Sequence, residues 1–504
     1  MSKVASKIVD VCFKLLMLGI LIATIFIDKN VDVLYPNEVR WDNAGYFLIA
    51  ICILGVIGCF VCRAKDLDEK KWKIAIIAIA ITTAVIQLII SLWMPTEIST
   101  DFKRVREAAI DIAQGGTLAG KSYFKASPNN INITLVLAVV YKIFGSWRAV
   151  IFIGSLLTNI SVILASLTVT RVTESRWSGI VTAVLGEVLV ALTWRAFLPY
   201  TDNYGMFFVA LTIWLYTSKL PTKAKMPLVI ASGIAGAFIK ETVLIILLAI
   251  GIHAFIVGLK GKNYKKLLIQ TGVSILLLFV GMAASKGVKT VTRNHLEYET
   301  VATSKGWQFL FMVGQNNDSY GVVNKGDTNL RKQMLKEYAD GGLNSAFLKE
   351  ALSRIKGRGL TGNVKFYLIK LNVAYNDGYF HNMRGFNDKD LSENFLYDLY
   401  VDDSTTAYAI GADVMQVLWD MVLVLLMMNA FVLSRKHKGE LDKDTFPQIA
   451  ILGITLYLML FEGRAKYLYM LMPVYLYYAG FVTARFWSFC KEIKESGILK
   501  VEKN

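Results

Sequence analysis

Hydrophobic stretches recur along most of the chain, and polar connectors separate them. A helix needs roughly 20 mainly apolar residues to cross the hydrocarbon core of a bilayer. By this criterion the pattern predicts candidate helices near residues 8–27, 44–62, 74–93, 131–145, 149–170, 177–193, 204–217, 227–239, 242–259, 267–285, 410–434, 447–461 and 467–487. We therefore expect an all-α polytopic membrane protein with a bundle of about 12–13 transmembrane helices.

Composition agrees with this class. The 504 residues are 55% hydrophobic, with a mean hydropathy of +0.46. The net charge of +16 would suggest nucleic acid for a soluble protein, but here Lys and Arg gather in short connectors between spans, as the positive-inside rule predicts. These connectors lie at 63–73, 219–225, 260–266 and 435–443. We expect contacts with membrane lipids, no nucleic-acid partner, and both termini on the cytoplasmic side.

Orientation divides the chain into four parts. Residues 1–73 form an N-terminal pair of spans, and residues 74–285 form a catalytic transmembrane module whose first outer loop covers 94–130. Residues 286–409 form the large extracytoplasmic segment, and residues 410–504 form the last spans and a cytoplasmic tail. Asp101 and Asp202 both fall outside only if one intervening run does not cross. The shortest, 131–145, carries Lys142, so we interpret it as an interfacial or re-entrant helix.

The large outer segment is polar and rich in glycine. Leu330 to Ile355 has helical spacing of apolar residues. The stretch at 314–321, Gly-Gln-Asn-Asn-Asp-Ser-Tyr-Gly, has two interpretations. It is either a sugar-binding loop or ordinary turn chemistry, since Asn, Asp, Ser and Gly all favour turns.

Polar residues stand at the outer ends of several spans, and they form four groups. The groups are Glu97 with Asp101, Asp202 in the segment 195–204, Lys240 with Glu241 in a tight helical hairpin, and Glu462, Arg464 and Lys466 before the last span. Together they supply carboxylates and cations at one expected membrane depth. The five cysteines lie in or beside apolar runs, so a disulfide framework is not expected.

Such a set suits glycosyl transfer from a lipid phosphate, which needs a base for the acceptor hydroxyl and cations for the released phosphate. Asp101 is the candidate base, and Asp202 is expected to orient the acceptor or a basic group. Lys240, Arg464 and Lys466 are the candidate phosphate ligands. Each residue also has a purely structural interpretation: Asp101 as a helix cap, Asp202 as an interfacial charge, and the cations as snorkelling anchors.

The same four places resemble motifs of the glycosyltransferase C superfamily, in particular the protein O-mannosyltransferases and the lipid A aminoarabinose transferase. The matching elements are Asp101-Phe102 with a helix ending in Ala113-Gln114-Gly115-Gly116, the loop from Pro199 to Asp202, Gly236 with Lys240, and Glu462-x-Arg464-x-Lys466-Tyr467 followed by Pro473. The resemblance covers roughly residues 74–260 and 447–480. Glu97 stands as a candidate second acid, since some members pair two acids in the first loop.

This resemblance implies an inverting glycosyltransferase that acts at the outer face of the cell membrane. The donor would be a polyprenyl-phosphate-linked sugar, and the acceptor a cell-envelope glycan, lipid or protein. No cofactor is expected, and the site carries no assigned metal, although its carboxylates are compatible with a divalent ion. Two other functions fit a chain of this kind: a lipid-linked polysaccharide polymerase or ligase, and a membrane transporter or flippase. A transporter would favour broken helices near the midplane and repeat symmetry between its halves.

Overall fold

The computed structural model describes residues 2–27, 43–64, 67–94, 100–259, 306–339, 341–380, 395–400, 402, 404–433 and 441–495, with isolated positions between 272 and 297. Glu97 and most of the expected helix at 267–285 lie outside these described residues. Within them the chain forms helices and no strand. Seven helices, α1 (Ser2–Phe26), α2 (Asn43–Arg63), α3 (Glu69–Trp93), α7 (Trp147–Thr173), α10 (Thr222–Ile239), α11 (Leu244–Gly258) extended by η4 (Glu241–Val243), and α17 (Thr406–Phe431), are long and apolar enough to cross a membrane.

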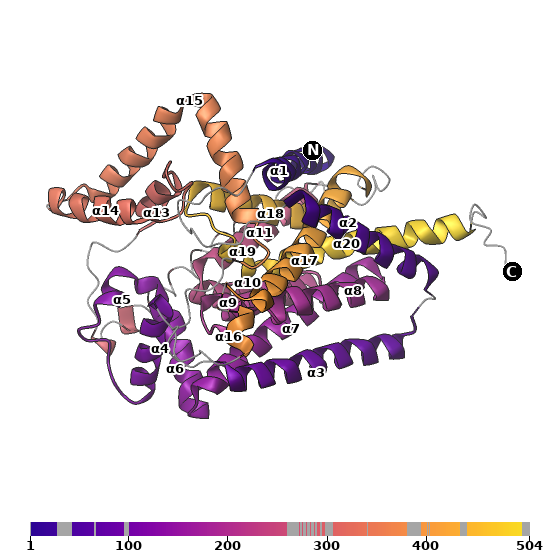
Figure 1. The fold of residues 1–504 in the computed structure, drawn as a ribbon, viewed down its shortest axis with the longest axis horizontal. Coiled ribbons are helices and arrows are strands. Elements are labelled where there is room, and N and C mark those ends of the chain that lie inside the picture. The colour runs from indigo at the N-terminus through magenta and orange to yellow at the C-terminus, as the bar shows by residue number, and fades with distance from the viewer. Residues whose placement is uncertain are drawn as a thin grey trace.

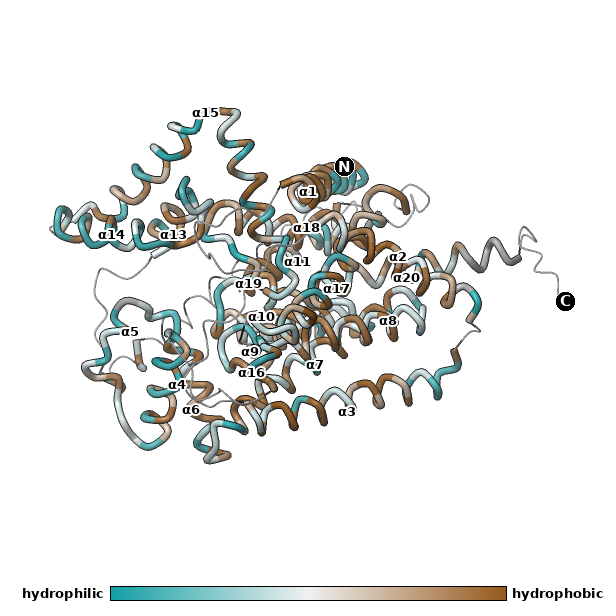
Figure 2. Tube along the Cα trace, in the orientation of Figure 1, coloured by the Kyte–Doolittle hydropathy of each residue, from teal (hydrophilic) through white to brown (hydrophobic). Residues whose placement is uncertain are grey.

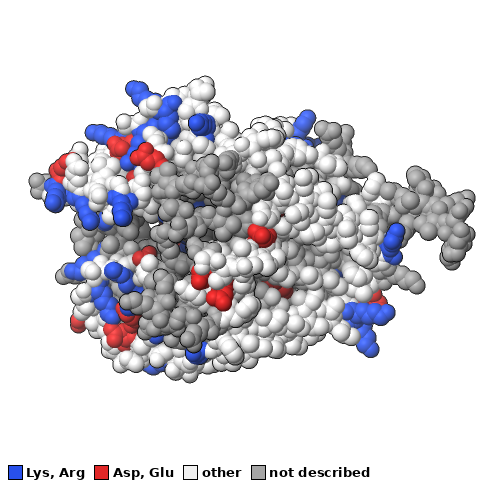
Figure 3. All heavy atoms as spheres, in the orientation of Figure 1, with Lys and Arg blue, Asp and Glu red and all other residues white. Residues whose placement is uncertain are grey.

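Among these helices, α3 and α7 run along the long axis of the molecule, and α3 lies at its lower edge (Figure 1). Large apolar side chains of α3 are exposed, among them Ile77, Ile81 and Leu92. Exposing such a row to water is unfavourable, so this surface belongs in lipid. Charged side chains gather mainly at the two ends of the molecule, and few lie on the face between them (Figure 3). The protein is therefore an all-α polytopic membrane protein, which confirms the class expected from hydropathy.

Shorter or less apolar helices complete the interior of the bundle. They are α8 (Arg176–Gly186) with the π-helix η2 (Glu187–Ala191), α9 (Thr201–Tyr216), α18 (Leu441–Leu460), α19 (Lys466–Tyr469) and α20 (Met472–Glu495). α9 packs against α7 and α10, while α20 packs against α7, α8 and α17. Close approach of α20 to α7 requires Gly480, since a Cβ atom there would lie 2.5 Å from Val169 Cγ2. Small residues at such crossings allow helices in membranes to pack closely.

The segment between α3 and α7 lies at one end of the bundle. It contains α4 (Thr100–Ala113), α5 (Ser122–Ala126), η1 (Pro128–Asn130) and α6 (Ile131–Phe144), and α4 packs against α6. With 14 residues, α6 is about 21 Å long, which is less than the roughly 30 Å thickness of the hydrocarbon core. Its length favours the interpretation of this run as an interfacial or re-entrant helix.

Residues 306–375 form an arm that projects beside α1 and then returns to the bundle (Figure 1). The arm consists of α13 (Trp307–Gly314), α14 (Lys325–Glu337) and α15 (Leu343–Tyr375), and α15 bends at Gly359, whose φ is 63°. The tube coloured by hydropathy alternates between polar and apolar along α14 and α15 (Figure 2). The helical spacing of 330–355 is thus confirmed, but the stretch belongs to two helices, because α14 ends at Glu337 and α15 begins at Leu343.

The second half of α15 lies among the membrane helices, which hydropathy does not indicate. Asn372 donates to the carbonyl of Ala23 in α1, at 2.6 Å, and Tyr375 stacks on Trp419 of α17. The stretch at 314–321 is a turn in which Asn316 Oδ1 accepts the backbone N–H of Asp318, at 2.9 Å. Only Gly314 belongs to a helix, and none of these eight residues lines the cavity described below. α16 (Phe395–Tyr400) then leads toward α17.

Candidate functional site

A cavity of about 780 Å³ lies at the end of the bundle that carries α4 and α6. Its walls come from widely separated parts of the chain, and the lining residues fall within 100–102, 127–132, 194–202, 237–245, 306–310 and 457–467. The connector between α2 and α3 lies at the opposite end of the bundle (Figure 1). Segments that are distant in sequence therefore build one chamber.

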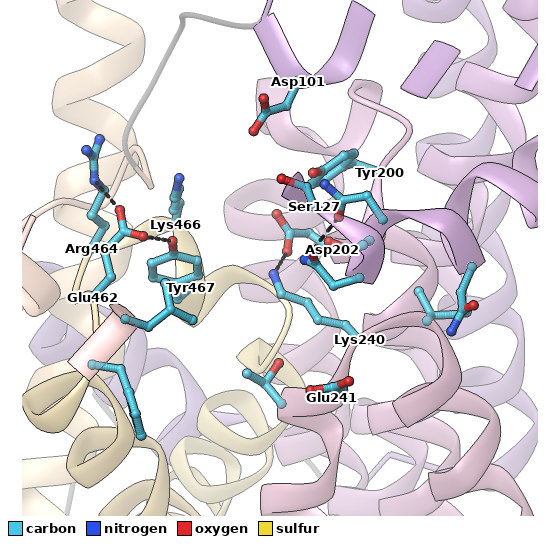
Figure 4. A pocket seen from close by; sticks show the side chains of 18 of the residues that line it. Asp101, Ser127, Tyr200, Asp202, Lys240, Glu241, Glu462, Arg464, Lys466 and Tyr467 are labelled. Atoms are coloured by element: carbon cyan, nitrogen blue, oxygen red, sulfur yellow. Dashed lines mark hydrogen bonds and ion pairs between the residues drawn. The ribbon is translucent and has the colours of Figure 1, made fainter. Parts of the chain in front are cut away.

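Five of the six candidate site residues line this cavity: Asp101, Asp202, Lys240, Arg464 and Lys466. Figure 4 shows Asp101 above the group, Asp202 with Lys240 on one side, and Arg464, Lys466 and Glu462 on the other. The sixth candidate, Glu97, lies outside the described residues. The structure therefore brings together the polar groups that the sequence places at four separate span ends.

Asp202 is the centre of a buried ion-pair cluster. It lies in the first turn of α9, where the helix dipole favours a carboxylate. Its Oδ1 accepts from Lys240 Nζ at 2.5 Å, and its Oδ2 accepts from Arg195 Nη2 at 3.2 Å. Asp202 and Arg195 are only 6% and 4% exposed. Asp202 thus pairs with two basic side chains, of which Lys240 was among the candidates and Arg195 was not.

The loop between α18 and α19 supplies a second cluster. Arg464 Nε lies 3.2 Å from Glu462 Oε1, and the hydroxyl of Tyr467 donates to Glu462 Oε2 at 2.8 Å. The Tyr467 ring lies near two ammonium groups, with its centroid 5.5 Å from Lys240 Nζ and 5.0 Å from Lys466 Nζ. This ring joins the two clusters through cation–π contacts.

Lys466 differs from the other cations of the cavity. Among the described residues, no carboxylate lies within ion-pairing distance of its Nζ. Burial lowers the pKa of Lys466 to about 8, and the positive charges of Arg464 and Arg195 contribute, although Glu462 and Asp202 oppose the change. An anion bound beside Lys466 would supply the missing negative charge.

Asp101 is exposed to the cavity from the first turn of α4. The helix begins at Thr100, so Asp101 lies inside the first turn. In the described part of the chain its carboxylate has no hydrogen-bond partner, which argues against a capping role. Phe102 packs on Tyr200 with ring centroids 4.7 Å apart, so α4 is fixed against the segment before α9. The arrangement leaves a carboxylate available to accept a proton.

Lys370 of α15 holds the cation-bearing loop in place. This side chain is fully buried, and its Nζ donates to the carbonyls of Gly314, Met459 and Phe461 at 2.5, 2.9 and 2.7 Å. The last two carbonyls belong to residues three and one positions before Glu462, where α18 ends and the loop to α19 begins. A lysine within the polar segment 286–409 gave no sequence signal for this contact, because its partners are backbone atoms far away in the chain.

Replacing Lys370 by Met is expected to lower the midpoint of thermal unfolding and to weaken ligand binding in the cavity. The substitution keeps the length of the side chain but removes the ammonium donor from the carbonyls of Gly314 and Phe461, at a cost of about 1–3 kcal/mol for each unsatisfied group. The Met459 carbonyl still accepts from Gln315 Nε2, at 3.3 Å. Thermal unfolding in detergent measures the effect. Lys365→Met is the matched control, since Lys365 is an exposed residue of the same helix. Equal unfolding midpoints for the two variants would contradict this role.

Two further acidic residues of apolar runs lie away from the site. Glu187 is in the π-helix η2 and is 2% exposed. Asp420 of α17 accepts from Gln416 of the same helix at 3.0 Å. Neither residue lines the cavity, so we assign them no role in ligand binding.

Comparison with known proteins places the whole bundle in one family. A family model described as a conserved hypothetical integral membrane protein matches residues 1–487. The chain therefore belongs to this family of integral membrane proteins. No curated protein and no solved structure matches the chain. The matched region extends from α1 into α20 and includes every segment that lines the cavity.

Proposed function

We propose that this member of the family of conserved hypothetical integral membrane proteins is an inverting glycosyltransferase. It transfers a sugar from a polyprenyl-phosphate donor to a glycan, lipid or protein of the cell envelope. The reaction takes place in the cavity, at the outer face of the cell membrane. The resemblance to the glycosyltransferase C superfamily supports this reaction type.

One observation carries the proposal. An unpaired carboxylate, Asp101, faces the same cavity as four cations: Arg195, Lys240, Arg464 and Lys466. A base and a phosphate-binding group are the two elements that transfer from a lipid phosphate needs. A phosphate leaving group requires little help from a general acid. The described residues that line the cavity include no histidine, and this chemistry does not need one.

The reaction would proceed by a single displacement. Asp101 accepts the proton of the acceptor hydroxyl as that oxygen forms a bond to the anomeric carbon of the sugar. The bond between the anomeric carbon and the phosphate oxygen breaks, and its electron pair stays on the departing lipid phosphate. Attack from the side opposite the phosphate inverts the anomeric configuration. Arg464 suits phosphate through its planar fork of donors, whereas Lys240 and Lys466 act as point charges.

The cavity also offers a surface for the lipid part of the donor. Trp307 and Leu310 of α13 line it, together with Phe461 at the end of α18. Trp307 is 56% exposed, and its ring provides an amphipathic surface of the kind found at membrane interfaces. A ligand with a phosphate head and an apolar chain therefore meets cations on one side and apolar side chains on the other.

Binding of a lipid phosphate tests the proposal. Because of the pKa of Lys466, the affinity is expected to depend on pH. Citronellyl phosphate, a short lipid phosphate, is expected to bind the purified protein in detergent and to bind more weakly above about pH 8. The lysine is a cation below its pKa of about 8 and becomes neutral above it. The phosphate itself is already doubly charged there, because its second pKa is about 6. The dissociation constant should therefore rise with pH across this range, measured by thermophoresis.

Two variants complete this experiment. Lys466→Arg should bind citronellyl phosphate with little pH dependence, because a guanidinium stays charged throughout the range. Lys349→Arg, on the exposed face of α15, is the matched control and should keep the wild-type pH profile. Displacement of citronellyl phosphate by an equal concentration of inorganic phosphate would identify free phosphate as the ligand. No binding of citronellyl phosphate at any pH would reject the proposed donor.

A further inference from the structure

Three buried side-chain oxygens of cavity residues have no hydrogen-bond partner among the described residues. They are Asn132 Oδ1, Thr201 Oγ1 and Thr242 Oγ1. Asn132 and Thr201 are only 2% and 4% exposed. Buried polar groups in proteins are nearly always paired. Three unpaired side-chain oxygens in the lining of one cavity therefore indicate a ligand that forms hydrogen bonds with them.

The backbone places these oxygens beside the proposed phosphate ligands. Thr201 directly precedes Asp202, and Thr242 follows Lys240 by two residues. The amide of Asn132 donates from Nδ2 to the carbonyl of Phe238, at 2.5 Å, in the turn of α10 that leads to Lys240. This bond fixes the amide and leaves Oδ1, the acceptor of the same amide, buried without a donor. A group attached directly to the bound phosphate would therefore meet these three side chains.

The surroundings define the chemistry of that group. The adjoining wall consists of the uncharged side chains Ser127, Asn129 and Asn130. The three atoms without partners are an amide oxygen and two hydroxyl oxygens, none of which carries a charge. A neutral group that carries several hydroxyls supplies the donors that these oxygens lack and brings no further charge into the cavity.

We propose that Asn132, Thr201 and Thr242 form the subsite for the sugar of the donor, and that this sugar is uncharged and rich in hydroxyl groups. The inference rests on the proposed function, because it takes the bound phosphate as its reference point. Asn132 and Thr201 are specificity-determining residues in this arrangement. A site built to hydrogen-bond a hydroxyl discriminates strongly against a ligand that lacks it, because its buried polar groups are then left unpaired.

Binding of synthetic donors tests the subsite. The probes are citronellyl phosphate and its esters with glucose, galactose, mannose, glucosamine and glucuronic acid, and the measurement is the dissociation constant in detergent. At least one neutral ester is expected to bind about tenfold more tightly than citronellyl phosphate, the gain of two or three hydrogen bonds. The glucosamine and glucuronic acid esters should bind no more tightly than citronellyl phosphate itself.

Variants of the subsite then show which residues account for the tighter binding of the neutral ester. Asn132→Ala and Thr201→Val should each reduce the affinity for the neutral ester, relative to the affinity of the same variant for citronellyl phosphate, by about fivefold. Thr168→Val is the matched control, since that buried hydroxyl bonds within α7, to the Leu164 carbonyl, and lies away from the cavity.

The outcomes separate the subsite from the proposed function. Binding of citronellyl phosphate without any gain from a neutral sugar would overturn the subsite and leave the phosphate site intact. Preference for a charged sugar, or an unchanged gain in both variants, would also overturn it. Failure of every probe to bind would reject the proposed function and this inference together.

Discussion

Asp101→Asn is expected to lower the rate of sugar transfer by about 10²- to 10⁴-fold, the contribution of a positioned general base. The amide keeps the shape of the side chain but cannot accept the proton of the acceptor hydroxyl. Asp101 is exposed and has no partner among the described residues, so the fold should not depend on it. Transfer to an added acceptor, followed with a labelled polyprenyl-phosphate sugar, measures the rate.

Asp111→Asn is the control for this substitution. Asp111 belongs to the same helix and pairs with Lys121, at 2.5 Å, outside the cavity lining. Its variant should transfer sugar at close to the wild-type rate. The Asp101 variant should also bind citronellyl phosphate with unchanged affinity. Activity of that variant within a few-fold of wild type would remove Asp101 from the mechanism.

Lys240→Ala and Arg464→Ala should each slow transfer by about 10²- to 10³-fold, the typical cost of removing a group that stabilises developing negative charge. The two residues lie in separate clusters but line the same cavity. If both act on one phosphate, the double variant should lose less than the product of the single effects. The measurement is a double-mutant cycle on the rate of transfer, with donor affinity determined in parallel.

Folding must be separated from function in this cycle. Lys240→Ala leaves Asp202 paired with Arg195 alone, so its unfolding midpoint should be compared with that of Lys240→Arg, which keeps the charge. Acceptor affinity should change little in any variant, because the substitutions affect the phosphate. Strictly multiplicative effects would show that the two cations serve different groups and would contradict a shared phosphate.

Much of the site was predictable because membrane proteins place charge at the ends of spans. Asp101, Asp202, Lys240 and Arg464 interrupt or follow apolar runs, where an unused charge is costly. Hydropathy therefore located them without knowledge of helix packing. Their pairing was not predictable in the same way. Arg195 appears in the sequence as one more charge near a span end, and only tertiary structure shows that it shares the carboxylate of Asp202.

The fold departs from the hydropathy pattern where polar residues are satisfied by backbone atoms. Lys370 and Asn372 make the end of α15 look like part of a soluble segment, yet both donate to carbonyls inside the bundle. Asn132 and Thr201 escaped notice for a different reason. Single amides and hydroxyls are common at helix ends. What distinguishes these two is that an oxygen of each side chain has no hydrogen-bond partner, and a sequence does not reveal this.

The ion pairs of the cavity have a consequence for ligand release under the proposed function. Lys240 and Arg195 already share Asp202, and Arg464 already contacts Glu462. A bound phosphate would add to these contacts and compete with the two carboxylates for the same cations, so the cluster attracts an anion less strongly than four unpaired cations would. In a glycosyltransferase the lipid phosphate left after transfer has to dissociate before the next donor enters. Under the proposed function, cations that already have carboxylate partners would favour rapid dissociation of that lipid phosphate. The same carboxylates reduce the repulsion among the cations of the cavity.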